Sequence, residues 1–325
     1  MTLAPSPLVL IPPVVTAPWA PPKPPRVWPV YVNMAIAISA ILGLAIALVI
    51  VIILIWAMQH GGIKPASPEY NAFIKDLITN PEFLLLSACL SQVATLGATL
   101  IPAWLSPEKV RFRLQLQKPA GHPLLLTWIA FAGVSVGIIF DCAIMFMEAH
   151  HIALPTQHLE DLDKSISNAS GLTSVLVFAS IVLGAPILEE LLCRGYMQSR
   201  LVRRHGPVLA ILICSAYFGL LHMDLLHSTF AFFFGLYLGI AAWRTGSTFT
   251  SIGVHLVNNL ISMLGSVFAW QLALSPYIRL AIGLALLASG LVAMRFIRPP
   301  PARSTPPAGS DGTGFPAYMP TSTTV

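Results

Sequence analysis

The sequence predicts an all-α, polytopic membrane protein with about eight transmembrane helices. Of its 325 residues, 56% are hydrophobic and only 10% are charged, whereas soluble domains average about 25% charged residues. The apolar residues gather in eight long runs, and a run of about 17–25 such residues crosses a bilayer as a helix, which satisfies its own backbone polar groups. The expected spans are residues 30–58, 82–105, 123–147, 171–197, 207–221, 228–243, 249–270 and 276–297.

Proline-rich ends flank these spans. Residues 1–29 and 299–325 are predicted to be disordered cytoplasmic tails, because such segments bury too little apolar surface and cannot sustain a helix or a sheet ladder. Residues 30–298 are expected to form the transmembrane helical domain, with residues 171–270 as its motif core. The first apolar run is about 27 residues long, too long for the apolar part of a signal peptide, so we expect it to remain as an anchor.

The basic residues predict the orientation. With the N-terminus in the cytoplasm, 13 of the 18 Lys and Arg residues fall on the cytoplasmic side and only three in outside loops. Cytoplasmic loops carry such an excess. An even number of spans places both termini in the cytoplasm, and we expect a multi-pass protein of a prokaryotic cell membrane. Scattered basic residues argue against a nucleic-acid partner, so the expected partners are the lipid bilayer and a membrane-associated protein or peptide; no signal of an oligomeric state is present.

Two adjacent acids interrupt the fourth expected span. Glu189 and Glu190 lie with Arg194 in a run that is otherwise apolar enough to enter a bilayer. A buried ionisable side chain is costly in hydrocarbon, so each needs a partner or a function. On a helix, Glu190 and Arg194 lie four residues apart in the favourable acid-before-base order. Glu190 therefore has a partner, and Glu189 is the candidate for chemistry.

Two further polar positions interrupt later spans. Phe218 precedes His222 by four residues, and His255 precedes Asn259 by four. This spacing stacks each pair on one face of a helix. Together with Glu189, these residues come from three separate spans, each at an energetic cost, which favours one shared polar site.

The depths of these residues agree only in part. Glu189 and Asn259 are expected near the middle of their spans, whereas His222 is expected nearer the outer end of the fifth span. Either that span begins later than residue 207, or the helices tilt or kink. Pro186 is the obvious candidate for a kink.

These side chains suit peptide hydrolysis by two routes. A carboxylate and an imidazole can hold and deprotonate a water, while a second imidazole and a carboxamide donate hydrogen bonds to the resulting oxyanion. Alternatively, Glu189, His222 and His255 could bind zinc with one open coordination position. Either route needs a water-filled cavity within the membrane. The HExxH and paired-aspartate motifs of other intramembrane proteases are absent.

The three motifs resemble those of a known family. Glu189-Glu190-x-x-x-Arg194, Phe218-x-x-x-His222 and His255-x-x-x-Asn259, in this order, are similar to the motifs of the CPBP family of intramembrane proteases. This family includes the CAAX-processing type II proteases and the bacteriocin-processing enzymes, also called abortive-infection proteins. The motifs cover residues 186–259, under a quarter of the chain. The family usually has an aromatic residue before the motif arginine, and Cys193 departs from that pattern.

The resemblance implies a role for each motif residue. Glu189 would activate water together with His222, while His255 and Asn259 would stabilise the oxyanion. The structural supports of the site would be Glu190, Arg194 and Phe218. Family members are described as metallo-endopeptidases, and a metal-free glutamate mechanism is also argued for them, so a divalent metal such as zinc and a metal-free route are equally open.

The sequence thus predicts an intramembrane endopeptidase, similar to a type II CAAX prenyl protease, acting on a membrane-associated substrate. One alternative is a scaffold or immunity protein that binds without cleaving. Another is a proton-coupled carrier with Glu189, His222 and Asp141 as a relay, although the inverted repeats common in carriers are not visible. Asp141 is expected instead to pair with a neighbouring helix or to lie near a cavity. Residues 148–170 are expected to be a solvated outside loop, with cation binding by its acids and histidines as the alternative.

Overall fold

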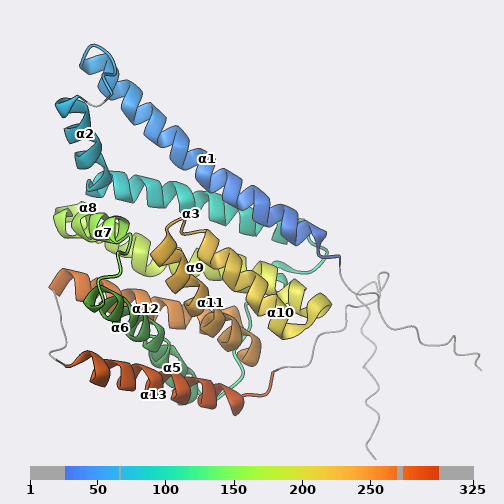
Figure 1. Ribbon diagram of the computed structural model, residues 1–325. Helices are drawn as coiled ribbons and strands as arrows, with labels where there is room; N and C mark the ends of the chain where they lie inside the picture. The colour runs from blue at the N-terminus through green and yellow to red at the C-terminus, as the bar shows by residue number, and fades with distance from the viewer. Residues whose placement is uncertain (1–25, 66, 269–273, 300–325) are drawn as a thin grey trace, which may run out of the picture. The chain divides into compact units, whose positions relative to one another are not determined.

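Helices are the regular secondary structure of the described part of the chain. The computed structural model describes residues 26–65, 67–268 and 274–299, so nearly all of the two predicted disordered tails lies outside the described residues. No strand occurs in these three ranges (Figure 1). The helices before the acid pair are α1 (Trp28–Gln59), α2 (Pro68–Ile78), α3 (Pro81–Trp104), α4 (Val110–Arg113), α5 (Pro123–Ala132), α6 (Ser135–Ala149), α7 (Gln157–Asn168) and α8 (Gly171–Ala179). Those that follow are the π-helical segment η1 (Ser180–Gly184), α9 (Ala185–Glu190), the π-helical segment η2 (Leu191–Gln198), α10 (Ser199–Leu220), α11 (Leu225–Thr245), α12 (Thr248–Phe268) and α13 (Pro276–Arg295).

Short polar side chains and prolines determine where several helices begin. The side chains of Ser67, Asn80, Asp224 and Ser275 each accept a hydrogen bond from a backbone N–H in the first turn of α2, α3, α11 and α13. Such caps satisfy donors that have no partner inside the helix. In α2, α3, α5 and α13 a proline occupies the first turn, where its missing N–H costs nothing.

Six helical stretches of the described residues are long and apolar enough to cross a membrane. They are Trp28–Gln59, Pro81–Trp104, Pro123–Ala149, Gly171–Leu220, Leu225–Thr245 and Pro276–Arg295. This confirms the predicted all-α, polytopic membrane protein but does not confirm the count of eight. Gly171–Leu220 contains both the fourth and the fifth expected span, and a kink at Gly206, with φ 78° and ψ 169°, divides α10 into two helices. The seventh, α12, is not among the six found in the described residues.

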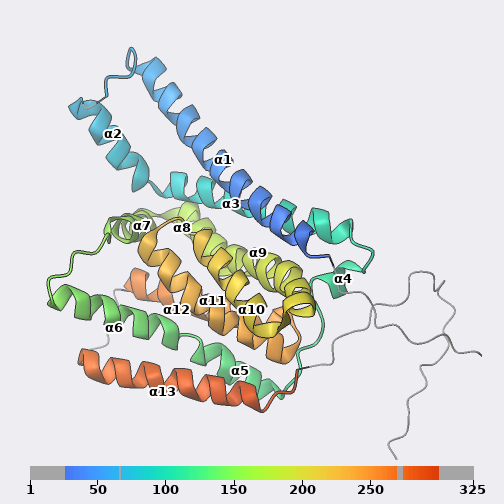
Figure 2. The same cartoon turned by 45° about the vertical axis from the view of Figure 1, so that its right-hand side comes forward.

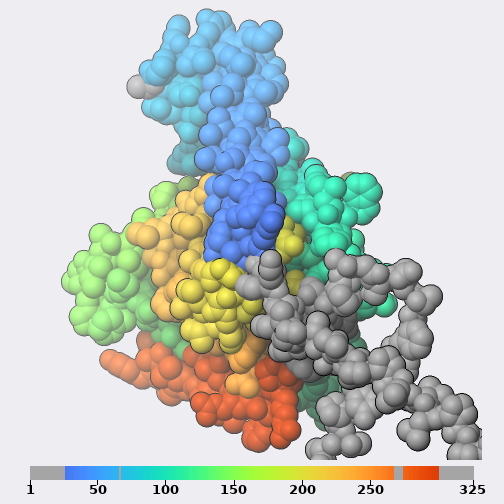
Figure 3. Space-filling model, turned by 90° about the vertical axis from the view of Figure 1, so that its right-hand side faces the viewer, coloured from blue at the N-terminus to red at the C-terminus, as the bar shows by residue number. Residues whose placement is uncertain are grey.

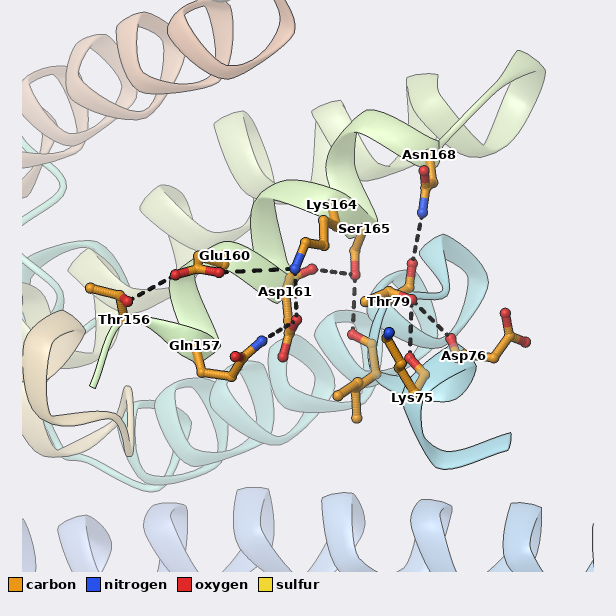
Figure 4. Close-up of polar contacts among 11 residues, drawn as sticks. Lys75, Asp76, Thr79, Thr156, Gln157, Glu160, Asp161, Lys164, Ser165 and Asn168 are labelled. Atoms are coloured by element: carbon orange, nitrogen blue, oxygen red, sulfur yellow. Dashed lines mark hydrogen bonds and ion pairs between the residues drawn. The ribbon is translucent and has the colours of Figure 1, made fainter. Parts of the chain in front are cut away.

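The acidic segment between α6 and α8 differs from expectation. Residues 148–170 were expected to be a loop, but they contain helix α7. Figure 4 shows how side chains four residues apart stabilise it: Thr156 Oγ1 donates to Glu160 Oε1 at 2.9 Å, and Gln157 Nε2 donates to Asp161 Oδ1 at 2.8 Å. Ser165 Oγ donates to Ile78 O at 3.2 Å, which attaches α7 to the end of α2.

The helices that carry the motifs pack through small residues. α10 and α11 lie side by side (Figures 1 and 2). A Cβ atom on Gly219 of α10 would lie 2.7 Å from Ser228 O of α11, and one on Gly235 of α11 would lie 3.1 Å from Ser215 Cα of α10. Larger residues would force the two backbones apart. Small residues are typical of helix interfaces in membranes, where close packing replaces the hydrophobic effect.

The first helix contacts the others mainly near its beginning. Val30, Asn33 and Ala37 are buried against the chain, and Asn33 Nδ2 donates to Ala98 O of α3 at 2.9 Å. The remainder of α1 exposes leucine, isoleucine and valine side chains. Figure 3 shows the far end of α1, in light blue, projecting beyond the other helices together with α2. An all-round apolar exterior suits a helix surrounded by lipid.

Candidate functional site

The acid pair lies on a short α-helix between two π-helical segments. In η1, the Ala185 N–H donates to Ser180 O, five residues back instead of four. Pro186 follows at the start of α9 and has no N–H to restore the α-helical register. η2 then begins directly after Glu190. π-helical turns inside α-helices are rare and frequently mark functional sites.

Glu190 is the centre of a buried ion pair. Its Oε1 accepts hydrogen bonds from Arg194 Nη1 at 2.6 Å and from His255 Nδ1 at 3.2 Å. The side chains of Glu190 and Arg194 are both 0% exposed. Arg194 Nη2 also donates to Gly235 O of α11 at 3.0 Å. The predicted pairing of Glu190 with Arg194 is confirmed, and it connects η2, α11 and α12 at one point.

Glu189 differs from its neighbour. Its side chain is half-buried, and among the described residues it takes part in no hydrogen bond and no ion pair. Consecutive side chains on a helix point about 100° apart, so Glu190 can face the buried arginine while Glu189 does not. The structure therefore agrees with the inference that only one acid of the pair has a structural partner.

Phe218 brings the three motifs together. Its ring is buried and meets the ring of His222 edge-to-face at a centroid distance of 5.1 Å, and that of His255 at 5.7 Å. The guanidinium of Arg194 lies over the same ring, 4.6 Å from its centroid. A cation over an aromatic face is attracted by the ring quadrupole, and more strongly when both are removed from water. The motif aromatic is thus the packing centre of the site.

His222 lies just beyond the end of α10. Its Nδ1 is 2.9 Å from Phe218 O, and because a carbonyl only accepts, Nδ1 must be the donor. The turn that follows is closed by Asp224, whose Oδ1 accepts from the backbone N–H of His227 at 2.8 Å. The ring centroids of His222 and His227 lie 4.2 Å apart. His227 was not among the predicted site residues, although a second histidine in the same polar turn was visible in the sequence.

Asn259 is held by a neighbour that the sequence argument also missed. Its Nδ2 donates to Ile181 O of η1 at 2.9 Å. The side chain of Asn258 is buried, and its Nδ2 donates to Asn259 Oδ1 at 3.3 Å. The two adjacent asparagines in the sequence were the signal that could have indicated this contact. These bonds attach α12 to the π-helical turn that precedes the acid pair.

The predicted metal ligands do not form a metal site as the side chains lie. Across the described ranges, no group of three or more His, Cys, Asp and Glu side chains is arranged to hold a metal ion. Nδ1 of His255 is bonded to Glu190 and Nδ1 of His222 to a carbonyl, which leaves Nε2 of each ring for other contacts. Because Glu189, His222 and His255 are not among such a group, the mechanism below is derived from the side chains alone.

A buried arginine outside the three motifs also stabilises η2. Arg113 of α4 donates from Nη1 to Tyr196 O at 2.8 Å and to Ser199 Oγ at 3.0 Å, and its guanidinium lies 4.1 Å from the centre of the Tyr196 ring. Burial, together with the nearby charge of Arg200, lowers the pKa of Arg113 to about 10. From sequence, Arg113 counted only as a topology signal. Its bonds span more than 80 residues, so no local pattern could have revealed them.

Comparison with known proteins assigns a family to this region. Residues 171–261 match the family model described as type II CAAX prenyl endopeptidase Rce1-like. The matched stretch contains all three motifs, from the acid pair to Asn259. No curated protein and no solved structure matches the chain. Residues 171–261 therefore form an Rce1-like domain of an intramembrane endopeptidase family in an integral, multi-pass membrane protein, which confirms the resemblance to the CPBP family.

Proposed function

We propose that this protein is an intramembrane endopeptidase that hydrolyses a peptide bond in a membrane-associated protein or peptide, using a water activated by Glu189 and His222. The observation that carries the proposal is the contrast between the two acids. Glu190 is fully buried and bonded to Arg194 and His255. Glu189 is half-buried and bonded to neither, so its carboxylate is available to accept a proton from water.

The first step is removal of a proton from water. The Nδ1–H of His222 is used by the Phe218 carbonyl, so a neutral ring presents the lone pair of Nε2 to a water. Glu189 takes one proton of that water as general base, and the water oxygen forms a bond to the carbonyl carbon of the substrate. The carbonyl π electrons move onto its oxygen. Positioned general bases contribute about 10²–10⁴-fold to rates.

The second requirement is stabilisation of the oxyanion. His255 donates from Nδ1 to Glu190, and the carboxylate stabilises the ring when Nε2 also carries a proton. Nε2–H then donates to the oxyanion. Asn259 uses one N–H of Nδ2 for Ile181 O and keeps a second for the same purpose. Donors fixed in advance act strongly in a site shielded from water.

The intermediate then collapses to products. The proton held by Glu189 passes to the substrate nitrogen as the carbon–nitrogen bond breaks and the carbonyl re-forms. Water has then supplied a hydroxyl group to the new carboxyl end and a proton to the new amine. Glu189 returns to its ionised state, ready for another water.

The alternative of a proton-coupled carrier loses one member of its relay. Asp141 of α6 accepts a hydrogen bond from Arg279 Nη2 of α13 at 2.7 Å. An acid with its own charged partner is poorly suited to pass protons to Glu189. Pairing with a neighbouring helix was one of the two roles expected of Asp141.

Cleavage by purified protein tests the proposal against a non-cleaving scaffold. The protein is reconstituted in liposomes with membrane-bound test peptides, one prenylated at a CAAX end, its unprenylated form, and a bacteriocin-leader peptide. Glu189→Ala and His222→Ala are expected to abolish cleavage, whereas Glu160→Ala on α7 is a matched carboxylate control outside the site. Full activity in folded Glu189→Ala protein would refute the mechanism. Chelator treatment with metal analysis of the same sample tests whether a metal contributes.

A further inference from the structure

The carboxamide of Asn259 is fixed at both of its ends. One end lies 2.9 Å from Ile181 O, and the other is 3.3 Å from Asn258 Nδ2. A backbone carbonyl only accepts hydrogen bonds, so the atom of Asn259 that faces Ile181 must be its nitrogen. The oxygen then faces the donor supplied by Asn258. The two contacts agree on one orientation of the amide.

Pro186 explains why Ile181 has a free carbonyl. In a regular α-helix, Ile181 O would accept from the Ala185 N–H, but that N–H donates to Ser180 O. In the π-helical register, the next donor would be residue 186, which is a proline without an N–H. A carbonyl that loses its helical donor inside a membrane needs another partner. The side chain of Asn259 supplies it.

The orientation of the amide decides what the site can stabilise. With Nδ2 bound to Ile181, its second N–H remains to donate to an oxygen that gains negative charge. With the amide turned over, Oδ1 would take that place and repel the same oxygen. Asn258, only 4% exposed, prevents this because its own amide donates to Oδ1. Neither Asn258 nor Pro186 has to touch the substrate to exert this effect.

We propose that Asn258 and Pro186 are positioning residues that hold the carboxamide of Asn259 in the one orientation able to donate to an oxyanion. The proposal rests on the proposed function, because it assigns to Asn259 the role of an oxyanion donor. Pro186 acts by leaving the Ile181 carbonyl without a helical donor, and Asn258 acts by occupying Oδ1.

Two substitutions test the two supports separately. Asn258→Leu removes the donor at similar volume, and Pro186→Ala restores an N–H that competes for Ile181 O. Each is expected to lower kcat about tenfold, while Asn259→Ala lowers it about 10²–10³-fold, the usual cost of losing an oxyanion donor. KM is expected to change less than about twofold in all three, because the interaction is made in the transition state.

Stability measurements separate positioning from folding. Alanine favours a helix more than proline does, so Pro186→Ala is expected to keep or raise the Tm while kcat falls. Asn33→Ala is the matched control: Asn33 is 8% exposed and donates one hydrogen bond to Ala98 O, far along the chain from the motifs. Its loss is expected to lower the Tm and to leave kcat unchanged.

Double variants give the decisive result. If Asn258 and Pro186 act through Asn259, then Asn258→Leu and Pro186→Ala lower kcat no further in an Asn259→Ala background. Losses that multiply in that background would overturn the proposal, as would full kcat in folded single variants. Should Asn258→Leu fail to fold, the same test is made with Pro186→Ala, by comparing its effect on kcat alone and in the Asn259→Ala background. Unchanged cleavage by Glu189→Ala or Asn259→Ala would overturn the proposed function itself, which distinguishes the two failures.

Discussion

Replacing Glu190 with alanine is expected to destabilise the protein far more than the same change at Glu189. Glu190 Oε1 accepts from Arg194 at 2.6 Å and from His255 at 3.2 Å, and both members of the ion pair are 0% exposed. Without Glu190, the partners left to the arginine among the described residues are Gly235 O and the face of Phe218. Its positive charge then remains buried without a counter-charge.

The expected cost follows from that uncompensated charge. Removing one partner of a buried ion pair destabilises proteins by about 3–5 kcal/mol. This is a large share of the free energy of unfolding of a whole domain, which is roughly 5–15 kcal/mol. Glu189 is half-buried and has neither a hydrogen bond nor an ion pair with the residues that the structure describes, so its replacement is expected to change the free energy of unfolding by about 0.5 kcal/mol or less. Cleavage is expected to be lost in Glu189→Ala all the same.

Unfolding in mixed micelles, followed by tryptophan fluorescence, measures these differences. A double variant, Glu190→Leu with Arg194→Met, serves as the control, because replacing both charges with apolar groups avoids the buried lone charge. It is expected to be more stable than Glu190→Ala alone. The reasoning would be refuted if Glu190→Ala unfolded within about 1 kcal/mol of the wild type, or if Glu189→Ala were equally destabilised.

Two further predictions concern stability and do not depend on catalysis. Burial raises the pKa of Glu108, but the hydrogen bond and charge of Arg203, 2.7 Å away, lower it below its usual value. The pair therefore contributes above the unfolded pKa of about 4.3 and is lost as the pH falls through the folded value. Glu108→Gln is expected to cost about 0.5–1 kcal/mol at neutral pH and nothing in acid, in unfolding measurements at both pH values; a difference that persisted in acid would contradict this. Gly195→Ala would place a Cβ 2.8 Å from Leu114 O and is expected to cost about 1–3 kcal/mol. Gly43→Ala meets nothing within 4 Å and is expected to gain about 0.5–1 kcal/mol; equal Tm values for the two variants would show that the contact at Gly195 is not tight.

Features set by neighbouring residues could be predicted from the sequence. The expected span 82–105 matches Pro81–Trp104 because Asn80 and Pro81 mark the start of α3 within its first turn. Glu190 and Arg194 form the expected pair because a spacing of four residues places both on one helix face. In each case the controlling interaction lies within one turn of helix, which a sequence displays directly.

Helix α7 was missed although its interactions are local. Its acids were interpreted as the solvated charges of a loop, whereas Thr156 with Glu160 and Gln157 with Asp161 are paired four residues apart. The spans were found as continuous apolar runs, whereas the apolar residues of α7 are spaced three and four apart, at Leu159, Leu162 and Ile166. This amphipathic spacing, together with the polar pairs, was the signal of a helix in this segment.

The supports of the site could not be found in this way. Arg113 bonds to Tyr196 and Ser199, and Asn259 bonds to Ile181, each across a separation of many tens of residues. These contacts exist only because helices from different parts of the chain pack together. A sequence shows which residues are costly to bury, but not which distant group removes the cost.

The site contains two pairs of adjacent, identical polar residues, and the two members of each pair have different roles. In Glu189–Glu190 and in Asn258–Asn259, one member is buried and the other is half-buried. Consecutive residues of a helix face directions about 100° apart, so one side chain can bond to the protein interior while its neighbour keeps hydrogen-bonding capacity for another molecule. The buried members, Glu190 and Asn258, each bond to a residue proposed to act on the oxyanion. A doublet of identical polar residues is thus the shortest sequence that can supply both a reactive group and its support, and a substitution in the buried member is expected to affect catalysis through the residue it holds.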